Sequence, residues 1–85
     1  MFWVYILESE KNGRFYIGQT ENLEARIERH NKGRNPSTKA YIPWRLKWSK
    51  EFKTRSEAVK AETELKALKK RESIEKFAAK NDFTS

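Results

Sequence analysis

The sequence predicts an α/β fold of the α+β type: a small three-stranded antiparallel sheet flanked by helices, in the order β-β-α-β-α-α. Three observations predict it: a hairpin signal near residue 12, a run of alternating hydrophobicity after Pro43, and a helix-capping box at residues 54–57. A chain of 85 residues has room for one core. Residues 1–85 are therefore expected to form a single domain, with the last few as a frayed tail.

A β-hairpin opens the chain. Its predicted strands are Phe2–Glu8 and Arg14–Gly18. Asn12-Gly13 between them is the commonest sequence of a two-residue hairpin turn, and in that register Ser9 pairs with Tyr16. Because side chains alternate along a strand, Tyr5 and Tyr16 are expected to lie on the same face. A loop two residues longer or shorter preserves this parity, whereas a change of one residue breaks it.

A first helix is expected after the hairpin. Thr20 or Asn22 can cap it, its inner face carries Leu23 and Ile27, and Gly33 is placed to end it near residue 32.

The second half of the chain contains a strand and two helices. Trp44, Leu46 and Trp48 alternate with basic and polar residues, which predicts a third strand with one basic side and its tryptophans turned to the core. The capping box then opens a second helix, and a short third helix follows. Their apolar positions at helical spacing are Ala58, Ala61, Leu65 and Leu68, and then Ile74, Phe77 and Ala78.

Positive charge is concentrated in one segment. The formal net charge is +7, and no Asp or Glu occurs between Arg29 and Lys50. Tyr41, Trp44 and Trp48 are interleaved with the basic residues there, a mixture that suits a polyanion with stackable bases. Nucleic acid is therefore the favoured partner. Composition alone supports equally well a solvated basic face that keeps a small protein soluble.

Several classes of protein are excluded or disfavoured. The chain contains no cysteine, so a disulfide framework and a thiolate zinc site are excluded, and a cytoplasmic location fits best. The apolar opening is too short for a signal peptide or a membrane span. We therefore expect no membrane association, and a monomer or weak dimer.

Glu62 is a candidate metal ligand. On a helical projection it falls between Ala58 and Val59, beside the core-facing stripe. A carboxylate at that position needs a metal ion, an arginine or hydrogen bonds as a partner. A boundary glutamate paired with Lys66 explains the same pattern, and the residues alone favour that simpler interpretation.

Arg26 and His30 form a candidate phosphate site. They are four residues apart, hence on one face of the first helix. An arginine fork can bind nonbridging phosphate oxygens, and a histidine can donate to phosphate or move a proton near neutral pH. Taken singly, a surface arginine, a structural histidine and strand tyrosines are all ordinary.

Together these residues resemble the GIY-YIG nuclease family over nearly the whole chain, and most closely its small stand-alone bacterial members. The resemblance rests on Trp3-Val4-Tyr5 and Tyr16-Ile17-Gly18, then on Arg26 and on a helical Glu62 after the third strand. The matching pattern also includes Thr20, Asn22-Leu23, His30-Asn31, Ser37-Thr38-Lys39 and Pro43-Trp44.

The resemblance implies an endonuclease that hydrolyses phosphodiester bonds with one Mg²⁺ or Mn²⁺ and no small-molecule cofactor. Glu62 would hold the ion, and Tyr16 would be the general base, with Tyr5 orienting or assisting. Arg26 would stabilise the charge of the transition state, and His30 would assist proton transfer or phosphate contact. DNA is favoured over RNA, and a role in DNA repair or recombination is expected.

The departures from the family pattern concern substrate binding. Gln19 stands where members that act in nucleotide-excision repair carry a lysine. That phosphate-binding charge is either absent or supplied by Lys39, and Arg34, Lys39 and Lys47 are the expected nucleic-acid contacts. No recognition domain accompanies the core, so cutting directed by structure or by single strands is expected rather than sequence-specific cutting. Asn81 is the one late candidate for the asparagine that many members carry near the site.

Two other classes of function remain open. A catalytically silent nucleic-acid-binding module would keep the basic segment but would not need Tyr16, Arg26 and Glu62 together. A protein-interaction domain would need an exposed apolar patch, which nothing in the sequence requires.

Overall fold

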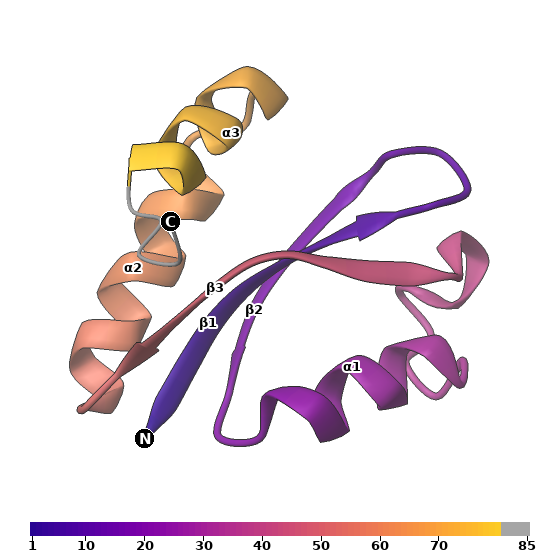
Figure 1. Cartoon of the computed structure of the whole chain (residues 1–85), viewed down its shortest axis with the longest axis horizontal. Helices are drawn as coiled ribbons and strands as arrows, with labels where there is room; N and C mark the ends of the chain where they lie inside the picture. Colours follow the sequence, from indigo (N-terminus) through magenta and orange to yellow (C-terminus); the bar gives the residue numbers. More distant parts are fainter. Residues whose placement is uncertain (81–85) are drawn as a thin grey trace.

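The computed structural model describes residues 1–80, in which a three-stranded antiparallel sheet carries helices on both faces (Figure 1). The strands are β1 (Phe2–Ser9), β2 (Phe15–Thr20) and β3 (Trp44–Phe52), in the spatial order β2-β1-β3. The helices are α1 (Leu23–Asn31), α2 (Arg55–Ala67) and α3 (Arg71–Lys80), with a short 3-10 helix, η1 (Lys39–Tyr41). The predicted fold is confirmed. None of these helices is long and apolar enough to cross a membrane.

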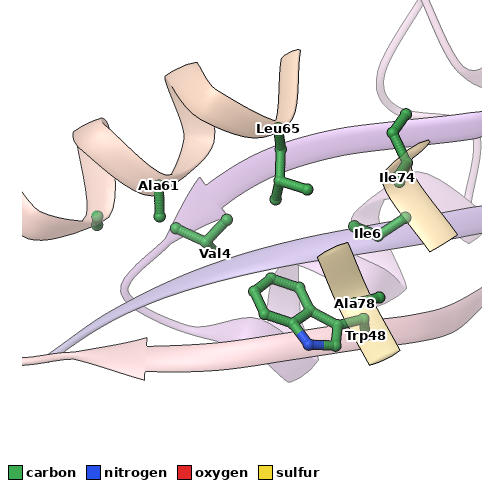
Figure 2. Packing of buried hydrophobic residues seen from close by; sticks show 8 residues of the cluster. Val4, Ile6, Trp48, Ala61, Leu65, Ile74 and Ala78 are labelled. Atoms are coloured by element: carbon green, nitrogen blue, oxygen red, sulfur yellow. The ribbon is translucent and has the colours of Figure 1, made fainter. Parts of the chain in front are cut away.

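The central strand β1 is covered on both faces. Val4 and Ile6 point toward α2 and α3, where they pack with side chains of both helices (Figure 2). Tyr5 and Leu7 point to the opposite face, where α1 lies (Figure 1). All four side chains are fully buried. This double cover explains why the opening strand is apolar almost throughout instead of alternating.

The hairpin turn is two residues longer than predicted. Leu7, not Ser9, is paired with Tyr16, so the predicted pairing is wrong by two positions. The turn is closed by Ser9, whose N–H donates to Arg14 O and whose carbonyl accepts from Gly13 N, both at 2.8 Å. The Ser9 hydroxyl also accepts backbone N–H groups inside the loop, which favours the longer turn. Because the shift is even, the predicted parity holds.

A β-bulge in β3 overturns the prediction that its apolar residues share one side. The register shifts between Ile6, which is opposite Trp48, and Leu7, which is opposite Leu46. The extra residue reverses the alternation, so Trp44 packs on the α1 face and Trp48 on the α2 and α3 face. Leu46 stays exposed.

The helix boundaries follow the sequence signals. Asn22, one of the two predicted caps, accepts the N–H of Ala25 at 3.1 Å, and Gly33 follows the end of α1 with φ of +72°. Thr54 caps α2 by accepting the N–H of Glu57 at 3.2 Å, as the capping box predicts.

Glu8 is a buried carboxylate that sequence reasoning did not single out. It is 5% exposed and accepts hydrogen bonds from Arg45 of β3 and Arg71 of α3, and Arg71 also donates to Gly13 O. Burial acts to raise the pKa of Glu8, but the hydrogen bonds and charges of the two arginines outweigh it and lower this pKa. Through these hydrogen bonds, the ionised Glu8 carboxylate holds α3 and the hairpin turn against the sheet.

We expect this network to make stability depend on pH. The pKa of Glu8 is lower in the folded state, so its contribution is complete above the unfolded value near 4.5 and is lost as pH falls through the folded pKa. Glu8→Gln should lower the free energy of unfolding at pH 7 by about 2 kcal/mol and flatten its decline below pH 4.5. Urea unfolding from pH 3 to 7 measures both effects, with Glu10→Gln as an exposed control. An unchanged acid slope in Glu8→Gln would contradict this role.

Candidate active site on the α1 face

The two tyrosines named by the sequence motifs lie together beneath α1. Their ring centroids are 6.3 Å apart, and Gly18 is directly opposite Tyr5 in the sheet. A Cβ atom on Gly18 would lie 2.6 Å from Tyr5 Oη and 3.2 Å from Tyr16 Cε1. Glycine is thus required here by the close approach of the two rings.

Gly18→Ala is expected to displace Tyr5, because the added methyl group overlaps its hydroxyl. The backbone of β1 and a fully buried ring leave little room to adjust, so we expect a loss of about 1–3 kcal/mol in the free energy of unfolding. Denaturant unfolding measures this loss. A crystal structure of Gly18→Ala with Tyr5 unmoved would contradict the steric explanation.

His30 links the tyrosines to the loop after α1. It is fully buried, with Nε2 3.3 Å from Tyr5 Oη and Nδ1 2.8 Å from Thr38 Oγ1, and its ring centroid is 4.8 Å from that of Tyr16. The Thr38 hydroxyl donates to Asn35 O at 3.4 Å, which leaves it to accept from His30 Nδ1. The lone pair of Nε2 then faces the hydroxyl of Tyr5.

The environment keeps both His30 and Tyr5 uncharged. Burial, reinforced by the charges of Arg26 and Arg29, lowers the pKa of His30 below its ordinary value. Burial and the neighbouring Tyr16 raise the pKa of Tyr5 to about 12, although Arg26 acts in the opposite direction. At neutral pH, Tyr5 is therefore a hydrogen-bond donor to a neutral imidazole. Tyr16 is partly exposed and is the tyrosine that a substrate can reach.

Arg26 supplies an uncompensated positive charge beside the tyrosines. It lies one turn before His30 on α1, is partly buried, and interacts with the Tyr5 hydroxyl. Among residues 1–80, no carboxylate lies within salt-bridge distance of it. Its guanidinium is therefore available to an anion.

Glu62 approaches from α2, on the opposite face of the sheet. Its side chain is 16% exposed; Oε1 accepts from Gln19 Nε2 at 2.9 Å, and Oε2 pairs with Lys66 at 3.0 Å. The ion pair between Glu62 and Lys66 is the one that the simpler interpretation of the sequence predicted. Gln19, which lies on the edge strand β2, is a second partner of Glu62. The charge of Glu62 also acts to raise the pKa of Tyr5, although more weakly than burial and Tyr16 do.

The family model of the GIY-YIG catalytic domain matches residues 1–77. The chain belongs to the GIY-YIG family. A curated relative, a UPF0213 protein of Streptococcus pneumoniae, is 36% identical over 80 residues, which cover 93% of this chain and 79% of the relative. A UPF0213 protein of Staphylococcus aureus is 33% identical over 73 residues, 85% of this chain and 88% of the relative.

A solved structure supports the same assignment. The solution NMR structure of a UPF0213 protein from Bacillus halodurans matches with a TM-score of 0.62 and 31% identity, covering 99% of this chain and 89% of that one. The chain is thus similar in sequence and fold to small bacterial proteins of this nuclease-type family, whose names state no activity.

Glu62 is the residue of the GIY-YIG site whose fit to a divalent ion can be judged from its contacts. Within residues 1–80, no three His, Cys, Asp or Glu side chains cluster as a metal cage. Mg²⁺ commonly retains several waters and binds through one or two carboxylates plus substrate phosphate. A single carboxylate, held in place by Gln19 and Lys66, fits this mode of binding and leaves most ligand positions to water and phosphate.

The three basic residues predicted to contact nucleic acid do not share one surface of the GIY-YIG domain. Arg34 lines a cavity of about 530 Å³ on the solvent side of α1, and Lys39 begins η1 close by, with its aliphatic chain against Gly33. Lys47 is the bulge residue of β3, and its Nζ lies 5.6 Å from the ring centroid of Phe15, which packs toward α2 and α3. Arg34 and Lys39 are therefore on the same side as the tyrosines.

Two residues of the family pattern, Thr38 and Asn31, make structural contacts that the sequence did not predict. Thr38 is buried and contacts His30, and its carbonyl accepts from Trp44 Nε1 at 3.0 Å. The Asn31 amide pairs with the backbone of Trp44, at 3.0 Å and 2.6 Å, and joins the end of α1 to β3. Asn81 lies outside the described residues.

Proposed function

We propose that this GIY-YIG protein is a divalent-metal-dependent endonuclease that cuts DNA, directed by single strands or branches rather than by sequence, in DNA repair or recombination. The observation that carries the proposal is the convergence of Tyr5, Tyr16, Arg26 and His30 on one face, with Glu62 hydrogen-bonded to Gln19 of β2, the strand that carries Tyr16. A binding module alone has no need for a tyrosine pair beside an arginine that has no carboxylate partner among residues 1–80.

Arg26 binds the scissile phosphate in this proposal. Its planar guanidinium can donate hydrogen bonds to two nonbridging oxygens at once. No carboxylate among residues 1–80 pairs with Arg26 and competes with the substrate. Charge on those oxygens increases as water attacks, so the arginine binds the transition state more strongly than the ground state.

Tyr16 takes the proton from the attacking water, and Tyr5 holds the geometry. Tyr16 is the more accessible phenol, whereas Tyr5 is buried, protonated and engaged with His30. The positive charge of Arg26, which lies beside the tyrosine pair, supports Tyr16 in this role. His30 stays neutral and keeps the tyrosine pair aligned through Thr38.

Glu62 would hold the divalent ion, and the ion would supply positive charge to the phosphate and to the leaving oxygen. Gln19 and Lys66 orient the carboxylate before substrate arrives. This arrangement reduces the reorganisation needed when the ion and the phosphate bind.

The test is Mg²⁺- or Mn²⁺-dependent cleavage of end-labelled single-stranded, duplex and branched DNA, with single-stranded RNA alongside. We expect cutting of single-stranded or branched DNA by the wild type, and none with chelator present. Gel-shift binding without any cleavage would instead establish the nucleic-acid-binding module.

Lys39→Ala is expected to weaken DNA binding and to reduce the slope of log K against log salt concentration by about 1, because one phosphate contact is lost. Lys47→Ala, on the opposite face of the sheet, should leave the slope closer to wild type. Fluorescence anisotropy over a series of salt concentrations measures both. A larger change in Lys47→Ala than in Lys39→Ala would move the binding surface to the α2 and α3 face.

A further inference from the structure

A small cavity at the end of β2 lies between helices from opposite faces of the sheet. Its volume is about 170 Å³. It is lined by Phe2, Gln19, Thr20, Glu21, Arg26 and Arg55. Arg26 comes from α1 and Arg55 from the first turn of α2, so two guanidinium-bearing residues from different helices border one small space.

Arg55 has the features of an anion-binding side chain. Its guanidinium carbon lies 5.1 Å from the ring centroid of Phe2, so stacking restricts its position. No carboxylate within residues 1–80 lies within salt-bridge distance of Arg55. Glu21 is the one acidic residue of the lining, and it is solvent-exposed. The two arginines therefore outnumber the acidic charge of the cavity.

The size of the cavity limits what it can bind. Sites for small organic ligands usually measure about 300–1,000 Å³, well above the volume found here. A phosphoryl group fits this space, whereas a nucleoside does not. The polar lining and the two arginines likewise match a phosphate better than a base.

The cavity adjoins the proposed catalytic groups. Gln19 lines it and also donates to Glu62, while Arg26 both lines it and interacts with Tyr5. Arg55 therefore borders the same cavity as Arg26, at the end of β2. A strand whose phosphate is bound by Arg26 at the tyrosine pair would pass close to Arg55.

We propose that Arg55 binds the backbone phosphate adjacent to the scissile one, so that Arg26 and Arg55 together hold two consecutive phosphates of a nucleic-acid strand. This inference rests on the proposed function. The contact involves no base, so it contributes affinity and strand alignment without sequence preference. It also selects strands that carry a phosphate beyond the cut.

The test compares two dinucleotides without metal, so that no cleavage takes place. The ligand pdTpdT carries two consecutive phosphates, and dTpdT carries one. NMR titration of the wild type should give about tenfold tighter binding of pdTpdT, a difference that Arg55→Ala reduces to less than about twofold. Lys53→Ala removes one exposed positive charge two residues away, outside the cavity lining, and should preserve the difference. Amide spectra verify that each variant is folded, and Arg55→Lys supplies a second variant with the charge retained.

Three results would overturn the inference: an unchanged preference in Arg55→Ala, equal loss in Lys53→Ala, or no binding of either dinucleotide. Pyrophosphate is titrated in parallel, and tighter binding of it than of pdTpdT would assign the cavity to a free diphosphate instead. A dinucleotide preference that depends on Arg55, in a protein that cuts nothing, would refute the nuclease proposal alone. Cleavage by wild type with an unchanged preference in Arg55→Ala would refute only this inference.

Discussion

Glu62→Ala is expected to abolish metal-dependent cleavage, by about a thousandfold or more, while DNA binding stays within a few fold of wild type. In the proposed function Glu62 is the carboxylate that holds the ion, whereas phosphate affinity is expected from arginine and lysine side chains. Removing it therefore removes charge stabilisation in the transition state and leaves the ground-state contacts in place. Single-turnover cleavage and gel shifts on the same substrate measure the two quantities.

The matched control for this prediction is Glu64→Ala. Glu64 lies two residues along α2 and is solvent-exposed, so its removal changes the net charge equally without touching Gln19 or Lys66. Thermal unfolding of both variants separates chemistry from stability. Parallel loss of cleavage and of binding in Glu62→Ala would refute the metal-ligand role.

Tyr16→Phe is expected to lower the rate of the chemical step by about 10²–10⁴-fold, the usual contribution of a general base. Tyr5→Phe should cost less, because a tyrosine whose pKa is raised to about 12 stays protonated and serves as a donor to His30. Removing the Tyr5 hydroxyl leaves a neutral imidazole with one hydrogen bond fewer. We therefore expect a modest loss of rate there and a measurable loss of stability.

The measurement is the pH dependence of single-turnover cleavage for wild type, Tyr5→Phe and Tyr16→Phe. Tyr41→Phe is the control, because this substitution also removes one phenolic hydroxyl. The Tyr41 hydroxyl lies outside the tyrosine pair and accepts a hydrogen bond from Arg14 at 2.8 Å. A rate that falls strongly in Tyr16→Phe and only modestly in Tyr5→Phe throughout the pH range would support the assignment. A greater loss in Tyr5→Phe than in Tyr16→Phe would reverse the two roles.

Local signals in the sequence predicted the helices and the arrangement of the tyrosines. The Thr54 capping box and Gly33 act through hydrogen bonds and backbone angles within a few residues, so the chain itself specifies them. The parity of Tyr5 and Tyr16 survived an error in the turn, because side chains alternate with period two and the turn differed by two residues.

Predictions that depended on pairing between distant segments were less successful. The bulge at Lys47 placed Trp44 and Trp48 on opposite faces of the sheet. The local sequence does not predict where the register between two strands shifts. The same bulge separates Lys47 from Arg34 and Lys39.

The sequence by itself determined the order of elements, the two-tyrosine motif, the family to which the chain belongs, and a glutamate at the boundary of the core. Only the tertiary structure decided what these residues meet. It placed Thr38 against His30, Gln19 against Glu62 and Arg71 against Glu8. It also brought Arg55 and Arg26 to the lining of one cavity. These contacts join segments that are distant in the chain or lie on different elements, and they form in a sheet that is covered by helices on both faces (Figure 1). Hydropathy and capping patterns report the preferences of neighbouring residues, whereas such contacts depend on the register and packing of the whole domain.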